Sequence, residues 1–125
     1  MAKKKILLID DDESYTKMIK MHLERTGKYE VTTENDEKQA LAAVQKANPD
    51  LILLDIMFPA TDGGEIAHRI ESDQKLKAIP IVFLTGTVTK EEIADQAGMI
   101  GGRRFLSKDM SIEELLNLVE ENIGG

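Results

Sequence analysis

The chain has 125 residues, a formal net charge of -7 at pH 7 and a hydrophobic fraction of 42%. This length suits one domain with a substantial core, so we expect residues 1–125 to form a single domain. The acidic balance disfavours direct binding to nucleic acid or to an anionic membrane, because both attract proteins rich in Lys and Arg. The absence of cysteine excludes a disulfide framework and a thiolate metal site.

No stretch of the sequence approaches the roughly 18 apolar residues that a membrane span needs. The first apolar run, ILLI at residues 6–9, is also shorter than the core of a secretory signal, which needs about 7–15 residues. A lack of cysteine is consistent with a reducing compartment. We therefore expect a cytoplasmic protein that does not bind membranes.

Five short runs rich in Ile, Leu, Val or Phe predict β-strands that are covered on both faces of a sheet. These runs are KILLID (5–10), YEVTT (29–33), DLILLD (50–55), PIVFLT (80–85) and RFLS (104–107).

Apolar residues at helical spacing follow each run and predict five helices. Capping boxes at TKEE (89–92) and SIEE (111–114) mark the starts of the fourth and fifth helices, and the proline at 49 ends the second. The apolar stripes consist of Tyr15, Met18, Ile19, His22 and Leu23; Ala40, Leu41, Val44 and Ala47; Ile66, Ala67 and Ile70; Ile93, Ala94 and Ala97; and Ile112, Leu115, Leu116, Val119 and Ile123.

The repeated β-α alternation predicts an α/β fold in which helices cover both faces of a parallel sheet. In such a sheet, ligands bind outside the carboxyl ends of the strands, at the crevice where the strand order reverses. The polar residues at these ends are Asp10 and Asp11 after the first strand, Asp55 at the third, Thr85 at the fourth and Lys108 after the fifth. If the strands are wound in the order 2-1-3-4-5, the carboxylates of the first and third strands converge.

Converging carboxylates need a counter-charge, and their hard oxygen ligands suit Mg²⁺ best. Because Mg²⁺ usually takes only one or two carboxylates, another stays free to act as a nucleophile toward a phosphoryl donor. Such a transfer relies on positioning and electrostatic stabilisation, for which a metal, a lysine and a hydroxyl donor are the parts required. Asp55 is the best candidate nucleophile, because it stands alone at the end of the central apolar run.

Taken together, these pieces resemble the receiver domain of two-component response regulators, of the chemotaxis-regulator kind, over essentially the whole chain. The matching stretches are LLIDDDE, PDLILLDIMFPATDGGE, PIVFLTG and RFLSK. An acid pair alone would be a weak signal, but D-x-x-x-P-x-x-D-G, a strand-ending Thr and a late Lys make it specific. The resemblance implies a flavodoxin-like (βα)5 sandwich of three layers, with a parallel five-stranded sheet in the order 2-1-3-4-5.

The resemblance also implies that Asp55 accepts a phosphoryl group from a sensor histidine kinase or a histidine phosphotransfer protein. Asp10 and Asp11 would hold Mg²⁺, Asp11 directly and Asp10 through water, together with Asp55 and the backbone carbonyl of Met57. Such a domain is a phosphorylated signalling switch in a phosphorelay rather than an enzyme. Its only catalysis is its own phosphorylation from small donors and its own dephosphorylation.

In the same family pattern, Thr85 and Lys108 would bind oxygens of the phosphoryl group. Phe105 would occupy an aromatic switch position and turn inward when Thr85 is drawn to the phosphate. An aromatic residue on the last strand is equally well explained as part of the core, so both interpretations of Phe105 stay open. The output would be a downstream protein target or a fused output domain, because the chain suits both a single-domain regulator and a piece of a longer protein.

Two features depart from the family pattern. Asp109 follows Lys108 where a proline, often in cis, is usual. A cis bond before a non-proline residue costs about 2.5–4 kcal/mol, so we expect a trans bond and a different loop here. Asp109 also offers Lys108 a competing partner. The segment from Thr85 to Lys108 is one residue longer than usual, which the glycines at 98, 101 and 102 can accommodate.

Two other functions fit part of the pattern. A haloacid-dehalogenase-like phosphatase would use Asp10 as nucleophile and Asp12 as acid/base, but Glu13 replaces the small residue expected next, and such enzymes need a larger chain. A receiver-like binding module that works without phosphorylation is disfavoured, because every site residue is present. Asp12 and Glu13 are better explained as the start of the first helix, where acidic residues are favoured.

Overall fold

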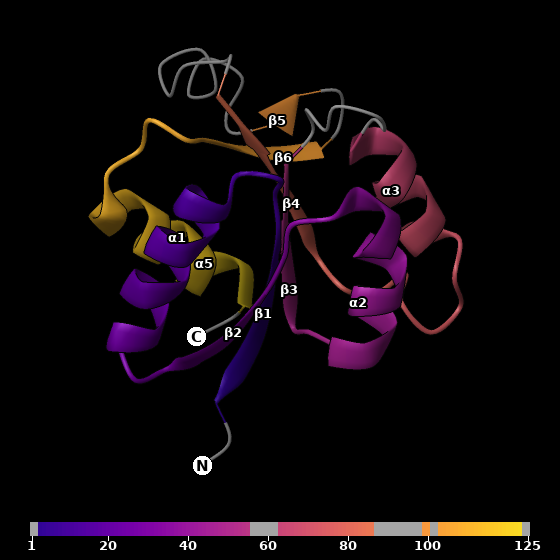
Figure 1. Cartoon of the computed structure of the whole chain (residues 1–125), viewed down its shortest axis with the longest axis horizontal. Helices are drawn as coiled ribbons and strands as arrows, with labels where there is room; N and C mark the ends of the chain where they lie inside the picture. The colour runs from indigo at the N-terminus through magenta and orange to yellow at the C-terminus, as the bar shows by residue number, and fades with distance from the viewer. Residues whose placement is uncertain (1–2, 56–62, 87–98, 101–102, 124–125) are drawn as a thin grey trace.

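The structure is a computed structural model that describes residues 3–55, 63–86, 99–100 and 103–123 of the chain. A central sheet is covered on one face by α1 (Glu13–Arg25) and α5 (Ile112–Ile123), and on the other by α2 (Ala40–Ala47) and α3 (Gly63–Glu71) (Figure 1). A short 3-10 helix, η1 (Glu37–Gln39), leads into α2. The expected three-layer α/β sandwich is confirmed. The predicted fourth helix and its capping box lie outside the described residues.

Six strands form the sheet in the described part of the chain, in the order β2-β1-β3-β4-β6-β5. Their bounds are Lys4–Ile9 (β1), Tyr29–Glu34 (β2), Leu51–Asp55 (β3), Ile81–Thr85 (β4), Met99–Ile100 (β5) and Arg103–Ser107 (β6). β2, β1, β3, β4 and β6 are parallel to their neighbours in this series. Because β6 is the fifth strand predicted from the sequence, the expected parallel order 2-1-3-4-5 is confirmed.

β5 is a two-residue edge strand that was not predicted from the sequence. It runs antiparallel to β6, with Ile100 opposite Arg103 and Met99 opposite Arg104. Two residues are too few to show the alternation by which a strand is recognised. The sequence between the paired residues is Gly-Gly, which is typical of a two-residue hairpin connection and is the signal that could have revealed this pairing.

The helix ends follow local signals in the sequence. Asp12 is the N-cap of α1, and its Oδ1 accepts a 3.0 Å hydrogen bond from the Tyr15 amide. At the start of α5, the Glu114 amide donates to Ser111 Oγ at 3.1 Å and the Ser111 amide donates to Glu114 Oε1 at 3.3 Å, as predicted for a capping box. α2 ends at Ala47, and its C-cap Asn48, just before the proline, has a left-handed φ of 45°.

β1 and β3 contribute side chains to two apolar layers, one on each face of the sheet. Their aliphatic side chains are at most 1% exposed. Because both faces are covered, these strands read as continuous apolar runs in the sequence, and their polar residues begin only at the carboxyl ends. The layer under α1 and α5 contains Ile6, Leu8, Leu51 and Leu53, and the layer under α2 and α3 contains Leu7, Ile9, Ile52 and Leu54.

Candidate functional site

Three carboxylates gather at the carboxyl edge of the sheet. β1 and β3 are neighbours with Ile9 opposite Leu54, so Asp10 and Asp55, which follow these two residues, reach the same edge. Asp10, Asp11 and Asp55 each contribute one carboxylate oxygen to a cluster whose atoms lie within 4.8 Å of one another. Asp10 and Asp55 are buried and Asp11 is exposed, so the cluster is open to solvent on one side.

The oxygens of this cluster fit a hard divalent cation. Asp10 Oδ2 is buried and receives no well-directed hydrogen bond from the residues that the structure describes. Closely spaced carboxylate oxygens are the ligands that Mg²⁺ prefers, and the exposed Asp11 leaves space for the waters that Mg²⁺ retains. The residues present therefore suit Mg²⁺. Met57, whose backbone carbonyl was expected as a further ligand, lies outside the described residues.

Lys108 brings a positive charge into the cluster. Its amide donates a 2.8 Å hydrogen bond to the Thr85 carbonyl, which ties the end of β6 to the end of β4. Its Nζ lies 2.6 Å from Asp10 Oδ2, as an ion pair, and 3.6 Å from Asp55 Oδ2. The bond to Asp109 is trans, as expected, and the exposed Asp109 does not draw Lys108 away from the two aspartates.

The charges of the site oppose one another and shift two pKa values. Burial, reinforced by the charge of Asp55, raises the pKa of Asp10 from 3.8 to about 6, although Lys108 and the Asp12 amide act in the opposite direction. Burial by itself lowers the pKa of Lys108, but the contact with Asp10 and the charges of Asp10, Asp55 and Asp12 outweigh it and leave this pKa raised. Lys108 therefore stays charged, while the Asp10 carboxylate is held in an environment that disfavours its negative charge.

Thr85 and Phe105, the expected switch residues, lie on adjacent strands but in different surroundings. Thr85 is fully buried at the end of β4, the strand next to the one that carries Asp55. Phe105 is half-buried on β6, and its ring centroid is 5.2 Å from that of Phe83, in the apolar layer under α2 and α3. In this structure Phe105 thus packs against the core and remains partly exposed.

Two residues near the site were not recognised from the sequence as belonging to it. Asn35 Nδ2 donates hydrogen bonds of 2.8 Å to the Asp10 carbonyl and 3.0 Å to Thr16 Oγ1, and so joins the ends of β2, β1 and α1. Tyr15 places its ring under Lys108 Nζ, 4.7 Å from the ring centroid. In the sequence, Tyr15 stands out only as part of an apolar helical stripe. An aromatic residue one turn after an acid cluster was the available signal.

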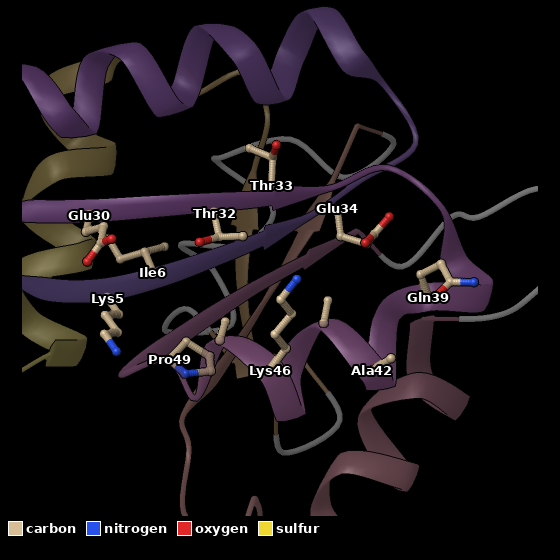
Figure 2. Close-up of a pocket in the computed structure, with 12 residues that line it drawn as sticks. Lys5, Ile6, Glu30, Thr32, Thr33, Glu34, Gln39, Ala42, Lys46 and Pro49 are labelled. Atoms are coloured by element: carbon tan, nitrogen blue, oxygen red, sulfur yellow. The ribbon is translucent and has the colours of Figure 1, made fainter.

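A separate groove of about 480 Å³ lies between the β2 edge of the sheet and α2 (Figure 2). Charged side chains from both elements, including Glu30, Glu34 and Lys46, face it beside the alanines of α2. None of the predicted site residues lines this groove. It is therefore distinct from the acid cluster at the carboxyl edge.

The chain belongs to the response regulator receiver domain family, whose sequence model matches residues 6–120. It is 38% identical over 119 residues to the nisin biosynthesis regulatory protein NisR of Lactococcus lactis, covering 95% of this chain and 50% of that protein. It is 37% identical over 116 residues to the phosphate regulon transcriptional regulatory protein PhoB of Pseudomonas aeruginosa, covering 93% of this chain and 50% of that protein. The chain thus spans about half the length of these two relatives.

Solved structures show the same fold. The chemotaxis protein CheY4 of Vibrio cholerae matches with a TM-score of 0.79 and 32% identity, over 96% of this chain and 98% of that one. The receiver domain of the sensor histidine kinase PA1611 of Pseudomonas aeruginosa matches with a TM-score of 0.80 and 28% identity, over 99% and 100% of the two chains. That structure has a magnesium ion coordinated in its active-site cleft.

Among the helices that the structure describes, none combines the length and the apolar character needed to cross a membrane.

Proposed function

We propose that Asp55 accepts a phosphoryl group, with the help of Mg²⁺, from a sensor histidine kinase or a histidine phosphotransfer protein. The proposal is carried by the convergence of Asp10, Asp11 and Asp55 oxygens within 4.8 Å, beside the Lys108 ammonium. The family is one of signalling domains rather than conventional enzymes. The chemistry at Asp55 therefore serves to change the surface that the domain presents to a partner.

The step required of the chain is attack by one Asp55 oxygen on phosphorus. The new O–P bond forms as the bond from phosphorus to the leaving group breaks. The bonding electrons leave with the imidazole nitrogen of a phosphohistidine, or with the acetate of acetyl phosphate. Asp55 is suited to this step because it is buried at the end of β3, which restricts its motion, and lies 3.6 Å from Lys108 Nζ. Lys108 would balance the charge spread over the phosphoryl oxygens.

Asp10, Asp11 and Asp55 would hold the Mg²⁺, whose positive charge stabilises the transferring phosphoryl group. Asp10 contributes an oxygen that is already desolvated and poorly hydrogen-bonded, so its binding to a cation has little to displace beyond the contact with Lys108. Asp11 is exposed and keeps the cluster open toward solvent, which is the side from which a phosphoryl donor can approach.

Thr85 and Phe105 would convert phosphorylation into a change of surface. The Lys108 amide is bonded to the Thr85 carbonyl, so a movement of Thr85 toward a phosphoryl oxygen acts on the ends of β4 and β6 together. Phe105 is half-buried on β6, and phosphorylation would favour a more buried position of its ring. A downstream protein or an output domain of the same protein would bind the altered face. The phosphate would then be lost by self-catalysed hydrolysis.

The phosphatase alternative gains no support from the position of Asp12. Its Oδ1 accepts the Tyr15 amide at 3.0 Å, and its own amide donates to Asp10 Oδ1 at 3.0 Å. The carboxylate that would serve as acid/base is therefore engaged in capping α1. A cytoplasmic location and the lack of direct contact with nucleic acid or membrane stay predictions.

The test is incubation with Mg²⁺ and acetyl phosphate, followed by measurement of the intact mass. We expect one phosphate adduct on the wild-type protein and none when Mg²⁺ is chelated. A wild-type protein that gains no adduct in the presence of Mg²⁺ would show the proposal to be wrong. Beryllofluoride with Mg²⁺, followed by NMR, tests the switch separately, through shifts at Thr85, Lys108 and Phe105.

A further inference from the structure

Lys108 has a third neighbour that the proposed transfer does not use. Its Nζ lies over the ring of Tyr15 at 4.7 Å from the centroid, a distance at which an ammonium is attracted to the face of an aromatic ring. Tyr15 lies in the first turn of α1 and packs against the apolar layer under α1 and α5. The ring is thus a fixed apolar surface on which the charged end of Lys108 rests.

The position of this ring is linked to the acid cluster through the backbone. The Tyr15 amide donates to Asp12 Oδ1 at 3.0 Å, and the Asp12 amide donates to Asp10 Oδ1 at 3.0 Å. The start of α1, and with it the ring, is therefore held to the buried carboxylate by two hydrogen bonds. This connection sets the ring at a defined place beside Asp10.

A fixed support for Lys108 matters most when Asp10 binds a cation. Of the charged groups that the structure describes, Asp10 Oδ2 lies 2.6 Å from Nζ and Asp55 Oδ2 lies 3.6 Å away. With Asp10 committed to Mg²⁺, the ammonium loses its closest partner. The residue after Lys108 is Asp109 and not a proline, so the loop lacks a locked φ that would restrict the lysine. The Tyr15 ring stays available, because it competes for neither cation nor phosphate.

The chemistry of the Tyr15 side chain supports this role. Burial, together with the charges of Asp10, Asp55 and Asp12, raises its pKa to about 12. The ring therefore carries no negative charge that would compete with Asp55 for Lys108 at neutral pH.

We propose that Tyr15 is a positioning residue for Lys108, whose ring keeps the ammonium beside Asp55 when Mg²⁺ occupies Asp10. This inference rests on the proposed phosphorylation of Asp55 and adds a residue to that site. The contact of the Tyr15 ring with the site is the one to Lys108 Nζ, so in this role its effect passes through Lys108.

The first test needs neither metal nor phosphate. Protons held over the face of an aromatic ring resonate upfield, so the Lys108 Hε protons should be shifted upfield relative to those of other lysines. The shift should persist in Tyr15→Phe, which keeps the ring, and disappear in Tyr15→Leu, which fills similar space without one. Ordinary Lys108 shifts in the wild-type protein would overturn the proposal, whatever the behaviour of the variants.

The second test is the rate of phosphorylation by acetyl phosphate in saturating Mg²⁺. Tyr15→Leu should lower the maximal rate by between about two- and thirtyfold, the range that a cation–π contact accounts for. Tyr15→Phe should react like wild type, and so should Met21→Leu, a control on the exposed side of α1. In a Lys108→Met background, Tyr15→Leu should cause no further loss. The same loss in both backgrounds would contradict a role that acts through Lys108.

The outcomes separate this inference from the proposed function. If the wild-type protein takes up no phosphate, phosphorylation of Asp55 is wrong and the ring-current measurement alone decides the contact. If it takes up phosphate and Tyr15→Leu reacts at the wild-type rate, only the positioning role is wrong. Should Tyr15→Leu lack a native thermal transition, Tyr15→Met replaces it as the ringless variant in both measurements.

Discussion

The middle of the sheet and its carboxyl edge bury opposite kinds of side chain, although β1 and β3 lead to both regions. In the middle, residues 6–9 of β1 and 51–54 of β3 bury aliphatic side chains that are at most 1% exposed. One residue further along the chain, Asp10 just after β1 and Asp55 at the end of β3 are also buried, at 0% and 3% exposure. Burial stabilises the aliphatic side chains, whereas it destabilises the charged form of a carboxylate.

This difference in burial separates the part of the sheet that stabilises the fold from the part that can respond to ligands. The aliphatic layers supply the free energy of folding, and the edge uses part of that free energy to hold like charges together near one ammonium. The raised pKa of Asp10 reflects this cost, because burial and the charge of Asp55 disfavour its ionised form. A cation or a phosphoryl group at the edge would relieve or redistribute the charge, so the edge responds to ligands while the middle does not.

The largest effect should come from Asp55→Asn, which tests whether the edge is the reactive region. We expect complete loss of the phosphate adduct, because the amide lacks a nucleophilic carboxylate. Stability without Mg²⁺ should be equal to or above that of wild type, since the substitution removes a charge that repels Asp10. Intact mass and urea unfolding measure the two properties. An adduct forming in the variant at the wild-type rate would place the acceptor elsewhere.

A substitution in the middle of the sheet should lower stability but leave phosphorylation intact. Leu53→Ala removes a fully buried side chain from the layer under α1 and α5, and should lower the free energy of unfolding by about 2–5 kcal/mol. Folded protein should still take up phosphate. Urea unfolding gives the loss, and Leu54→Ala in the opposite layer is the matched variant. If Asp55→Asn lowered the free energy of unfolding more than Leu53→Ala, the proposed difference between the edge and the middle of the sheet would be wrong.

The pH dependence of stability should single out Asp10. Its folded-state pKa is raised, so its contribution is greatest below pH 3.8 and is lost as the pH rises through about 6. At about 1.4 kcal/mol per pH unit, wild type should lose about 2 kcal/mol relative to Asp10→Asn between pH 4 and 7. Asparagine keeps an oxygen for the Asp12 amide, so the cap of α1 is preserved.

The same pair of proteins tests the role of the cation. Mg²⁺ at pH 7 should raise the unfolding temperature of wild type, because it neutralises the charge that burial disfavours. Asp10→Asn should respond much less. An equal Mg²⁺ response in the two proteins would mean that Asp10 does not contribute to the cation site.

The smallest effect is expected from Ser111→Ala, which belongs to neither region. Loss of the Ser111 hydroxyl that accepts the Glu114 amide should lower the free energy of unfolding by about 1 kcal/mol. Phosphorylation and the response to Mg²⁺ should not change. Thermal unfolding with and without Mg²⁺ is the measurement, and a weakened Mg²⁺ response would show that the end of α5 is coupled to the site.

Much of the architecture could be predicted from local patterns. Continuous aliphatic runs indicated covered parallel strands, and the helix starts at Asp12 and Ser111 follow short-range capping chemistry. Asp10 and Asp55 could be placed at one edge because strand ends in a parallel sheet share a side. β5 was missed, because a two-residue pairing leaves no periodicity in the sequence and only the Gly-Gly pair between its partners hinted at a turn.

The sequence by itself determined which residues stand at the strand ends, and hence the chemical character of the site. Only the tertiary structure decided how they differ. Asp10 and Asp11 are adjacent in the chain, yet one is buried and the other exposed, because β1 ends at Ile9 and the chain bends at Asp11. Lys108 pairs with Asp10 across 98 positions of sequence and lies over the Tyr15 ring, although Asp109 is its immediate neighbour. Such contacts depend on how separate elements pack, which local propensity and periodicity do not specify.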